Sequence, residues 1–283
     1  MTNIRGFWPL TKANTLGIIV FQICPSLMAS LVISIFNNNG LYVGSDSQIE
    51  LGSTVLTNSA KKLFPIADAC CVSITGGFGR MFMMNGHEIG HIFFPAIIER
   101  ISNNSCLIDG PLEFKINKVL ADFGAEYTNY TKVLSLERKN PNSRIDDEGI
   151  RLTFWGYDAS SAKFFGRSYF FLSTNQITLD TPFERGVTNF GSTVTLQGEI
   201  YFLSGLIYTK DAPLTEFRTA EFKARTEDVL AEHALPEKQL VAYMLGLFEL
   251  HKQYAAKFGS DKGLISPPYT IYKITKEHIA RVH

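Results

Sequence analysis

The fold of this 283-residue chain is decided by residues 30–46, which read SLVISIFNNNGLYVGSD. Two β-prone runs, residues 31–36 and 41–43, flank the segment Asn37–Gly40. An Asn-Gly pair between two such runs is a strong signal for a hairpin. The sequence therefore predicts two antiparallel strands, with Ser30 at the start of the first. Asp46 follows directly on the second, where its carboxylate can reach back toward Ser30.

Two further residues continue this pattern downstream. Lys62 lies in the segment Asn58–Phe64, and a third apolar run, residues 69–74, ends abruptly at Thr75-Gly76-Gly77. A buried strand that stops at paired glycines can present bare backbone amides to a ligand. These residue types suit a hydrolase with an N-terminal nucleophile, because one terminal residue then carries both the attacking oxygen and the amine that activates it.

The segment Ser30–Gly77 resembles the start of a proteasome-type β-subunit, and its pattern is closest to the HslV-like members of that family. Residues 46–55 read DSQIELGSTV, which is similar to the HslV pattern D-x-Q-x-x-L-G-x-T-V. Lys61-Lys62 matches the pair of lysines that follows this pattern. The strong resemblance covers about fifty residues, and the rest of the chain follows the family's order of elements more loosely.

The resemblance implies a role for each residue of the site. Ser30 stands where the family has the threonine that begins the mature chain, and its terminal amine would act as the base. The pKa of a free terminal amine is about 8, and an adjacent Lys62 ammonium would lower it by like-charge repulsion. Asp46 would keep Lys62 charged and in place, and the Gly76 amide would stabilise the oxyanion, a contribution of about 3 kcal/mol. No metal or organic cofactor is needed.

Two departures from the family pattern concern Ser30. Serine keeps the hydroxyl of threonine but loses the methyl group that restricts χ1, so a slower enzyme is expected. The serine becomes terminal only if the Ala29–Ser30 bond is cut, and the family usually has glycine where Ala29 stands. The family's later serine and aspartate have no clear counterparts. Gly198-Glu199 occupies the first of these places, Asp261 and Ser266 match the second only roughly, and we assign none of them a role.

Residues 1–29 are expected to form a leader, and residues 30–283 the hydrolase domain. Three interpretations of the leader remain open: a propeptide removed by the enzyme itself, a secretory signal, or a non-native upstream segment if translation begins at Met28. The apolar stretch Leu16–Phe21 behind Arg5 and Lys12 resembles a short signal sequence, but Gln22 and Pro25 interrupt it.

The rest of the chain is expected to supply further helices and strands, in an order that suits two antiparallel sheets packed face to face with a helical layer outside each. This is an α+β fold, the four-layer αββα sandwich of proteasome-like N-terminal nucleophile hydrolases. Helices are predicted over residues 81–101, 112–136, 199–208 and 237–257, and strands over residues 150–155, 164–172, 192–197 and 269–274. The segment 209–236 is longer than the corresponding segment of HslV and is expected to form a solvated helix, with a partner-facing element or a lid as the alternative.

The amino-acid composition limits the partners and the compartment that can be expected for this protein. The chain has 27 basic and 27 acidic residues, and zero net charge without a basic cluster argues against nucleic acid. No apolar run is long enough to span a bilayer. The four cysteines have no metal-ligand spacing, so thiols in a reducing, cytoplasmic compartment are expected. The resemblance implies peptide or unfolded-protein substrates and a homo-oligomeric ring that a separate ATPase could feed.

Two alternatives compete with the N-terminal nucleophile. His87-Glu88-Ile89-Gly90-His91 fits H-E-x-x-H, which on a helix places two imidazoles on one face for zinc, with Glu88 as the general base of a metallopeptidase. A third ligand is also required, and Glu99, Glu113, Asp122 or Glu126 could be proposed. The other alternative is a silent proteasome-like scaffold subunit, in which Lys62 and Asp46 form only a structural ion pair.

Overall fold

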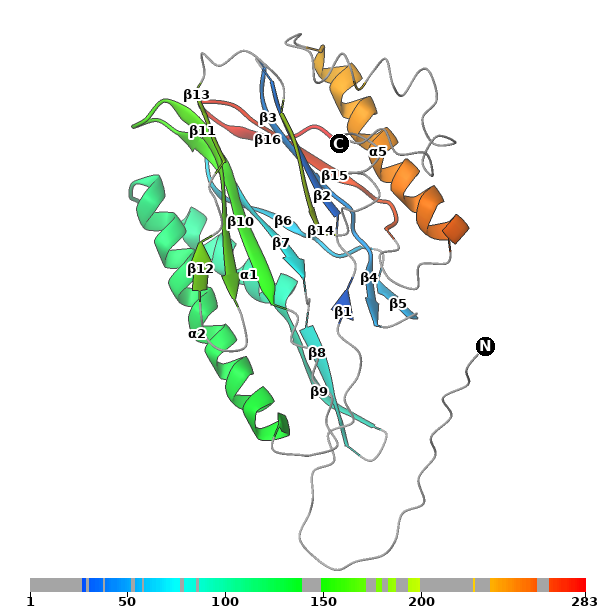
Figure 1. The fold of residues 1–283 in the computed structure, drawn as a ribbon. Helices are drawn as coiled ribbons and strands as arrows, with labels where there is room; N and C mark the ends of the chain where they lie inside the picture. Colours follow the sequence, from blue (N-terminus) through cyan, green and yellow to red (C-terminus); the bar gives the residue numbers. More distant parts are fainter. Residues whose placement is uncertain are drawn as a thin grey trace, which may run out of the picture.

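The chain folds into antiparallel sheets covered by helices, an α+β architecture, in the computed structural model (Figure 1). The structure describes residues 27–28, 31–37, 39–51, 54–57, 59–76, 79–84, 87–138, 149–171, 177–179, 183–186, 193–198, 226, 235–258 and 265–283. The predicted helix at 199–208 and nearly all of the segment 209–236 lie outside these residues.

The first sheet is built on the hairpin that the sequence predicts. In spatial order it consists of β14 (Thr193–Gly198), β2 (Leu31–Asn37), β3 (Gly40–Ser45), β15 (Thr270–Ile274) and β16 (Ile279–Arg281). Asn37 pairs with Gly40 at the end of the β2–β3 ladder. Gly40 has a φ of 137°, a conformation that glycine adopts without steric cost. The predicted hairpin is therefore confirmed.

The second sheet contains the strand that ends at Gly76. Its order is β12 (Ile177–Leu179), β11 (Lys163–Phe171), β10 (Ile150–Asp158), β7 (Cys70–Gly76) and β6 (Leu63–Ala67), and β13 (Phe183–Gly186) also pairs with β11. The ladder between β7 and β10 runs from Gly76 opposite Ile150 to Cys70 opposite Gly156. Residue 76 thus lies at one end of this sheet and residue 70 at the other.

Three hydrophobic clusters separate four layers. One packs α1 (Phe94–Cys106) and α2 (Leu112–Arg138) on the second sheet, another packs α5 (Glu237–Phe258) on the first sheet, and a third lies between the two sheets. Figure 1 shows α1 and α2 on one side of the sheets and α5 on the other. The described residues therefore form the helix, sheet, sheet, helix arrangement expected from the order of elements.

Strand β2 shows how the sequence encodes an inner layer. Leu31, Ile33 and Ile35 contribute to the cluster under α5, whereas Val32 and Phe36 contribute to the cluster between the sheets. Because successive side chains of a strand point to opposite faces, a strand covered on both faces must be apolar at almost every position. All seven residues of β2 are buried.

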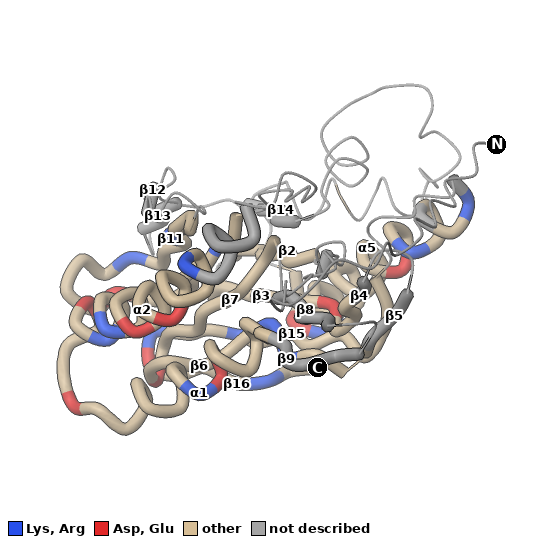
Figure 2. The backbone as a smooth tube through the Cα atoms, turned by 90° about the horizontal axis from the view of Figure 1, so that it is seen from below, with Lys and Arg blue, Asp and Glu red and all other residues tan. Residues whose placement is uncertain are grey.

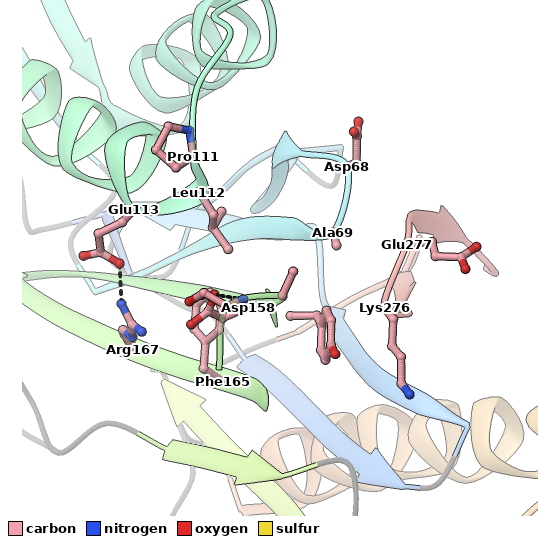
Figure 3. Close-up of a pocket in the computed structure, with 13 residues that line it drawn as sticks. Asp68, Ala69, Pro111, Leu112, Glu113, Asp158, Phe165, Arg167, Lys276 and Glu277 are labelled. Atoms are coloured by element: carbon pink, nitrogen blue, oxygen red, sulfur yellow. Dashed lines mark hydrogen bonds and ion pairs between the residues drawn. The ribbon is translucent and has the colours of Figure 1, made fainter. Parts of the chain in front are cut away.

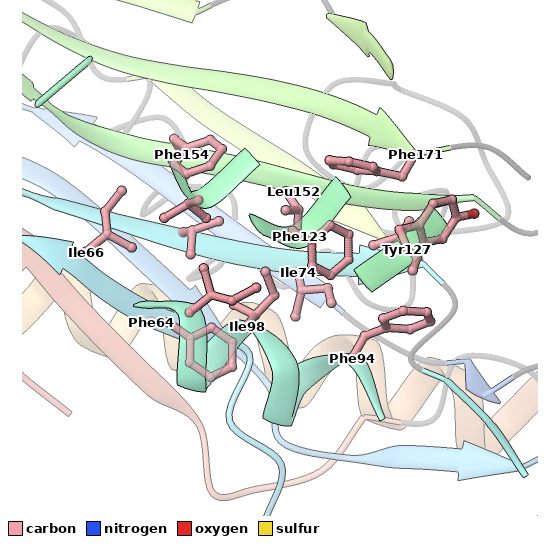
Figure 4. Close-up of a cluster of buried hydrophobic side chains, with 14 of the residues drawn as sticks. Phe64, Ile66, Ile74, Phe94, Ile98, Phe123, Tyr127, Leu152, Phe154 and Phe171 are labelled. Carbon is pink, nitrogen blue, oxygen red and sulfur yellow. The ribbon is translucent and has the colours of Figure 1, made fainter. Parts of the chain in front are cut away.

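Helix α2 confirms the predicted helix at 112–136. Its buried hydrophobic residues, among those whose burial is described, are Ile116, Val119, Phe123, Tyr127 and Tyr130, which recur at helical spacing. Figure 4 shows Phe123 and Tyr127 facing Phe94 of α1 and Phe171 of β11. The ring of Phe123 lies 4.8 Å from that of Phe171 in an edge-on contact. Charged residues of both signs are interspersed along the helix (Figure 2), where Lys118 pairs with Asp122 at 3.0 Å.

The helix predicted over residues 81–101 is wrong in its first half. Residues Gly79–Met84 form β8, His87–Phe93 form β9, and these strands pair as a hairpin before α1 begins at Phe94. The sequence contains one signal for the hairpin turn and another for the start of the helix. Asn85-Gly86 favours a two-residue hairpin turn, and Pro95 suits the first turn of a helix but not its interior.

A third, smaller sheet lies near the start of β2. It consists of β1 (Leu27–Met28), β4 (Ile49–Leu51) and β5 (Thr54–Thr57), all antiparallel. Leu27 pairs with Leu51 and Met28 with Glu50. Residues that directly precede Ala29 are thus held in a strand.

We expect the aromatic contacts of α2 to carry a large share of the packing between the helices and the second sheet. Replacing Phe123 by Ala should lower the free energy of unfolding by about 3–5 kcal/mol, because Phe123 is fully buried and its removal leaves a cavity. Replacing Phe114 by Ala, in the same helix but 51% exposed, should cost less than about 0.5 kcal/mol. Urea unfolding of both variants measures the difference, and equal losses would contradict this account of the core.

Candidate active site

Asp46 joins the end of β3 to the beginning of β2. The residue is buried, and its Oδ1 accepts a hydrogen bond from the backbone N–H of Leu31 at 2.9 Å. Its Oδ2 accepts another from the N–H of Gln48 at 3.1 Å. The carboxylate therefore binds the first backbone amide of β2 and closes the turn that follows β3.

Lys62 forms an ion pair with the same carboxylate. Its Nζ lies 2.9 Å from Oδ1 and 2.8 Å from Oδ2 of Asp46, and it donates to the carbonyl oxygen of Gln48 at 2.6 Å. Both side chains are completely buried. Removing two charges from water is costly, and a buried pair is tolerated when close contact and further hydrogen bonds compensate for the lost hydration. The three oxygen atoms around Nζ provide this compensation.

Gly76 lies at the end of β7, close to Lys62, which precedes the neighbouring strand β6. The N–H of Ile74 donates to the carbonyl oxygen of Lys62 at 3.1 Å, and Gly76 follows two residues later, about 7 Å along the strand. Gly76 has a φ of 97°, and a Cβ at this position would collide with the carbonyl oxygen of Gly149. Any other residue here would therefore be strained.

Three of the four predicted site residues are brought to one end of the sandwich. Asp46 and Lys62 are in direct contact, and Gly76 is close to Lys62 through the β-ladder. Ser30 lies outside the described residues. It is covalently bonded to Leu31, whose N–H is held by Asp46.

His87 and His91, the ends of the H-E-x-x-H pattern, both belong to β9. Four residues span about 13 Å in a strand but only about 6 Å in a helix. The pattern binds zinc because a helix brings its two histidines to one face within one turn, so its geometric premise is contradicted here. Within the part of the chain that the structure describes, no three His, Cys, Asp or Glu residues form a group that could hold a metal ion.

The described cysteines do not offer a rival nucleophile at this site. Cys70 and Cys71 lie in β7 and are buried, and burial raises the pKa of both thiols. Neutral thiols are poor nucleophiles. Cys106, at the end of α1, is more exposed, yet desolvation also raises its pKa.

Sequence reasoning gave no role to the segment before β15, which reaches the same end of the sandwich. The N–H and Oγ of Ser47 donate to the carbonyl oxygen of Ser266 at 3.5 and 3.4 Å. Tyr269 is buried, stacks on Phe248 at 4.7 Å and donates to Glu249 of α5 at 2.9 Å. Burial, followed by that hydrogen bond, raises the pKa of Tyr269. No local motif marks these long-range contacts in the sequence.

Comparison with known proteins adds no assignment: the sequence matches no model of a protein family and no curated protein. Among the described helices, none has the length and apolarity needed to cross a membrane.

Replacing Lys62 tests the contribution of the buried ion pair to stability, and replacing its neighbour Lys61 provides the control. Replacing Lys62 by Met should lower the free energy of unfolding by about 3–5 kcal/mol, because the Asp46 carboxylate would stay buried without its partner. Replacing Lys61 by Met should cost only about 0–1 kcal/mol, since Lys61 pairs with Glu99 at the surface. Denaturant unfolding measures both values.

A double variant tests whether the unpaired Asp46 charge causes this loss of stability. Asp46→Asn added to Lys62→Met removes both charges, so this double variant should be more stable than Lys62→Met alone. If the double variant were the less stable of the two, the unpaired charge could not be the source of the loss.

Proposed function

We propose that this protein is a proteasome-like N-terminal nucleophile hydrolase that cleaves amide bonds in peptides or unfolded proteins through an ester at Ser30. One observation supports it above the others: the buried Asp46–Lys62 pair binds the N–H of Leu31, the residue that follows Ser30. The peptide bond between Ser30 and Leu31 is about 1.33 Å long, so we expect the serine beside the ammonium.

The first reaction frees the terminal amine. The Oγ of Ser30 attacks the carbonyl carbon of Ala29, the C–N bond between the two residues breaks, and the nitrogen takes up the proton. Water then hydrolyses the resulting ester and releases the leader with Ala29 as its new carboxyl terminus. Ser30 is left with both a hydroxyl and an α-amine, which together form the mature nucleophile.

The pairing of β1 with β4 supports cleavage at this bond. Met28 pairs with Glu50 on one side of Ala29–Ser30, and Leu31 is held by Asp46 on the other. Residues on both sides of the bond are therefore anchored by backbone contacts. An anchored bond of this kind favours intramolecular attack, since the reacting groups need not be brought together from solution.

In the mature enzyme each site residue would have a separate task. The α-amine takes the proton of the Ser30 hydroxyl as the oxygen attacks the substrate carbonyl, and later returns a proton to the leaving amine. Lys62 favours the neutral, basic form of this amine by like-charge repulsion. The Gly76 amide stabilises the oxyanion. Water completes the cycle by hydrolysing the ester.

The wider setting follows from the resemblance of residues 30–77 to the family. We propose a homo-oligomeric ring in the cytoplasm, acting alone or with a separate ATPase. Neither a metal nor an organic cofactor takes part in this chemistry.

We expect the wild-type protein to be converted to a chain that begins at Ser30, and Ser30→Ala to keep its full length and lack peptidase activity. Ser30→Thr restores the β-methyl group of the family nucleophile and should be processed, with activity at least equal to that of the wild type. Intact mass and N-terminal sequencing follow processing, and hydrolysis of an unfolded protein substrate follows activity.

Circular dichroism of Ser30→Ala controls for folding. A wild-type chain that stays at full length and is inactive would instead support the scaffold subunit. Peptidase activity that survives in Ser30→Ala would place the chemistry elsewhere in the molecule.

A further inference from the structure

A cavity of about 550 Å³ lies at the end of the second sheet that is remote from Gly76 (Figure 3). It is formed where the β6–β7 turn, the start of α2, the β10–β11 turn and the residues after β15 come together. Ala69 of its lining precedes Cys70, the first residue of β7, whereas Gly76 is the last. Seven strand residues span about 20 Å, so the cavity is separate from the candidate active site.

Apolar side chains form much of the cavity lining. Ala69, Leu112 and Tyr157 line the space and are partly exposed, whereas Phe165 is almost completely buried and offers little surface to a ligand. The volume is within the range of about 300–1,000 Å³ that is typical of small-molecule sites. A flat apolar group of modest size matches this lining.

One cation of the lining is already neutralised. Arg167 donates to Glu113 at 2.7 Å, and its guanidinium lies 4.7 Å from the centre of the Phe165 ring. The protein thus places one of its own cations between an aromatic ring and a carboxylate, which is a favourable arrangement for an organic cation.

The remaining charges around the cavity are mainly negative. Asp158 accepts hydrogen bonds from the N–H and Oγ of Ser160 at 2.9 and 2.7 Å and from the Oγ of Ser161 at 2.7 Å. These bonds lower the pKa of Asp158 and hold its carboxylate in one position. Three of its roughly four acceptor positions are used, which leaves room for one more donor. Asp68, Glu277 and Lys276 complete the charged lining.

We propose that this cavity binds a small aromatic amine, with the aromatic group against Tyr157 and Leu112 and the ammonium donating to Asp158. Asp68 and Glu277 attract the cation to the opening, and Lys276 only partly offsets them. The site does not depend on Ser30 or on the proposed hydrolysis.

Titration calorimetry with 2-phenylethylammonium tests the proposal on the full-length Ser30→Ala chain, which avoids any change caused by processing. We expect saturable binding that weakens as salt is added, since the contact is charged. Asp158→Asn should weaken binding about tenfold, because a charge-assisted hydrogen bond is lost. Asp122→Asn, on α2 and paired with Lys118 outside the cavity, is the matched control and should bind as tightly as the parent.

A second variant covers the case in which Asp158→Asn disturbs its turn and fails to fold. Asp68→Asn combined with Glu277→Gln changes two exposed side chains only and should also weaken binding of the amine. The probe 3-phenylpropionate has nearly the same shape with the opposite charge, and we expect it not to bind. The proposal is overturned if the amine shows no saturable binding at millimolar concentration, if 3-phenylpropionate binds equally well, or if the double variant binds the amine like its parent.

Discussion

The ion pair between Lys62 and Asp46 is the constraint on which the rest of this end of the molecule depends. It connects the residue before β6 with the residue after β3, and through Asp46 it also holds the first amide of β2. Elements of both large sheets are therefore tied together at one buried point. An apolar pair of the same volume could fill the space, but it would leave the N–H groups of Leu31 and Gln48 without their acceptor. The charged pair therefore both joins the sheets and satisfies the backbone groups at this point.

The layers around the pair explain why both groups can be so completely removed from water. The first sheet is covered by α5 on one face and by the second sheet on the other, and the second sheet is covered in turn by α1 and α2. Both sheets are therefore inner layers. Lys62 and Asp46 lie at the ends of inner strands, where a side chain can be buried while the backbone turns. In such surroundings the electrostatic effect of a charge on its neighbours is stronger than in water.

Much of the fold follows from local patterns in the sequence. The β2–β3 hairpin, the strand ending at Gly76 and the helix from Leu112 could be predicted because turn chemistry and the spacing of apolar residues agree there. The segment Met81–Phe93 could not be assigned by apolar content alone, since short apolar runs are ambiguous between helix and strand. Asn85-Gly86 and Pro95 are the local signals that indicate the hairpin turn and the start of the helix there. The zinc alternative depended on the same expected helix, because H-E-x-x-H brings its two histidines together when it lies on a helix.

The candidate site also combines features that the sequence indicates with contacts that it does not. Asp46 and Lys62 could be placed in one site because the resemblance to proteasome-type β-subunits assigns them to it. Asp46 also directly follows a predicted strand, whereas β6, which follows Lys62, was not predicted. The contacts of Ser47 with Ser266 and of Tyr269 with Glu249 join residues far apart in the chain, and no local pattern specifies them. They fasten the segment before β15 and α5 to the turn that contains Asp46. Contacts from α5 and from both large sheets therefore meet at the turn that contains Asp46, where the proposed chemistry requires precise geometry.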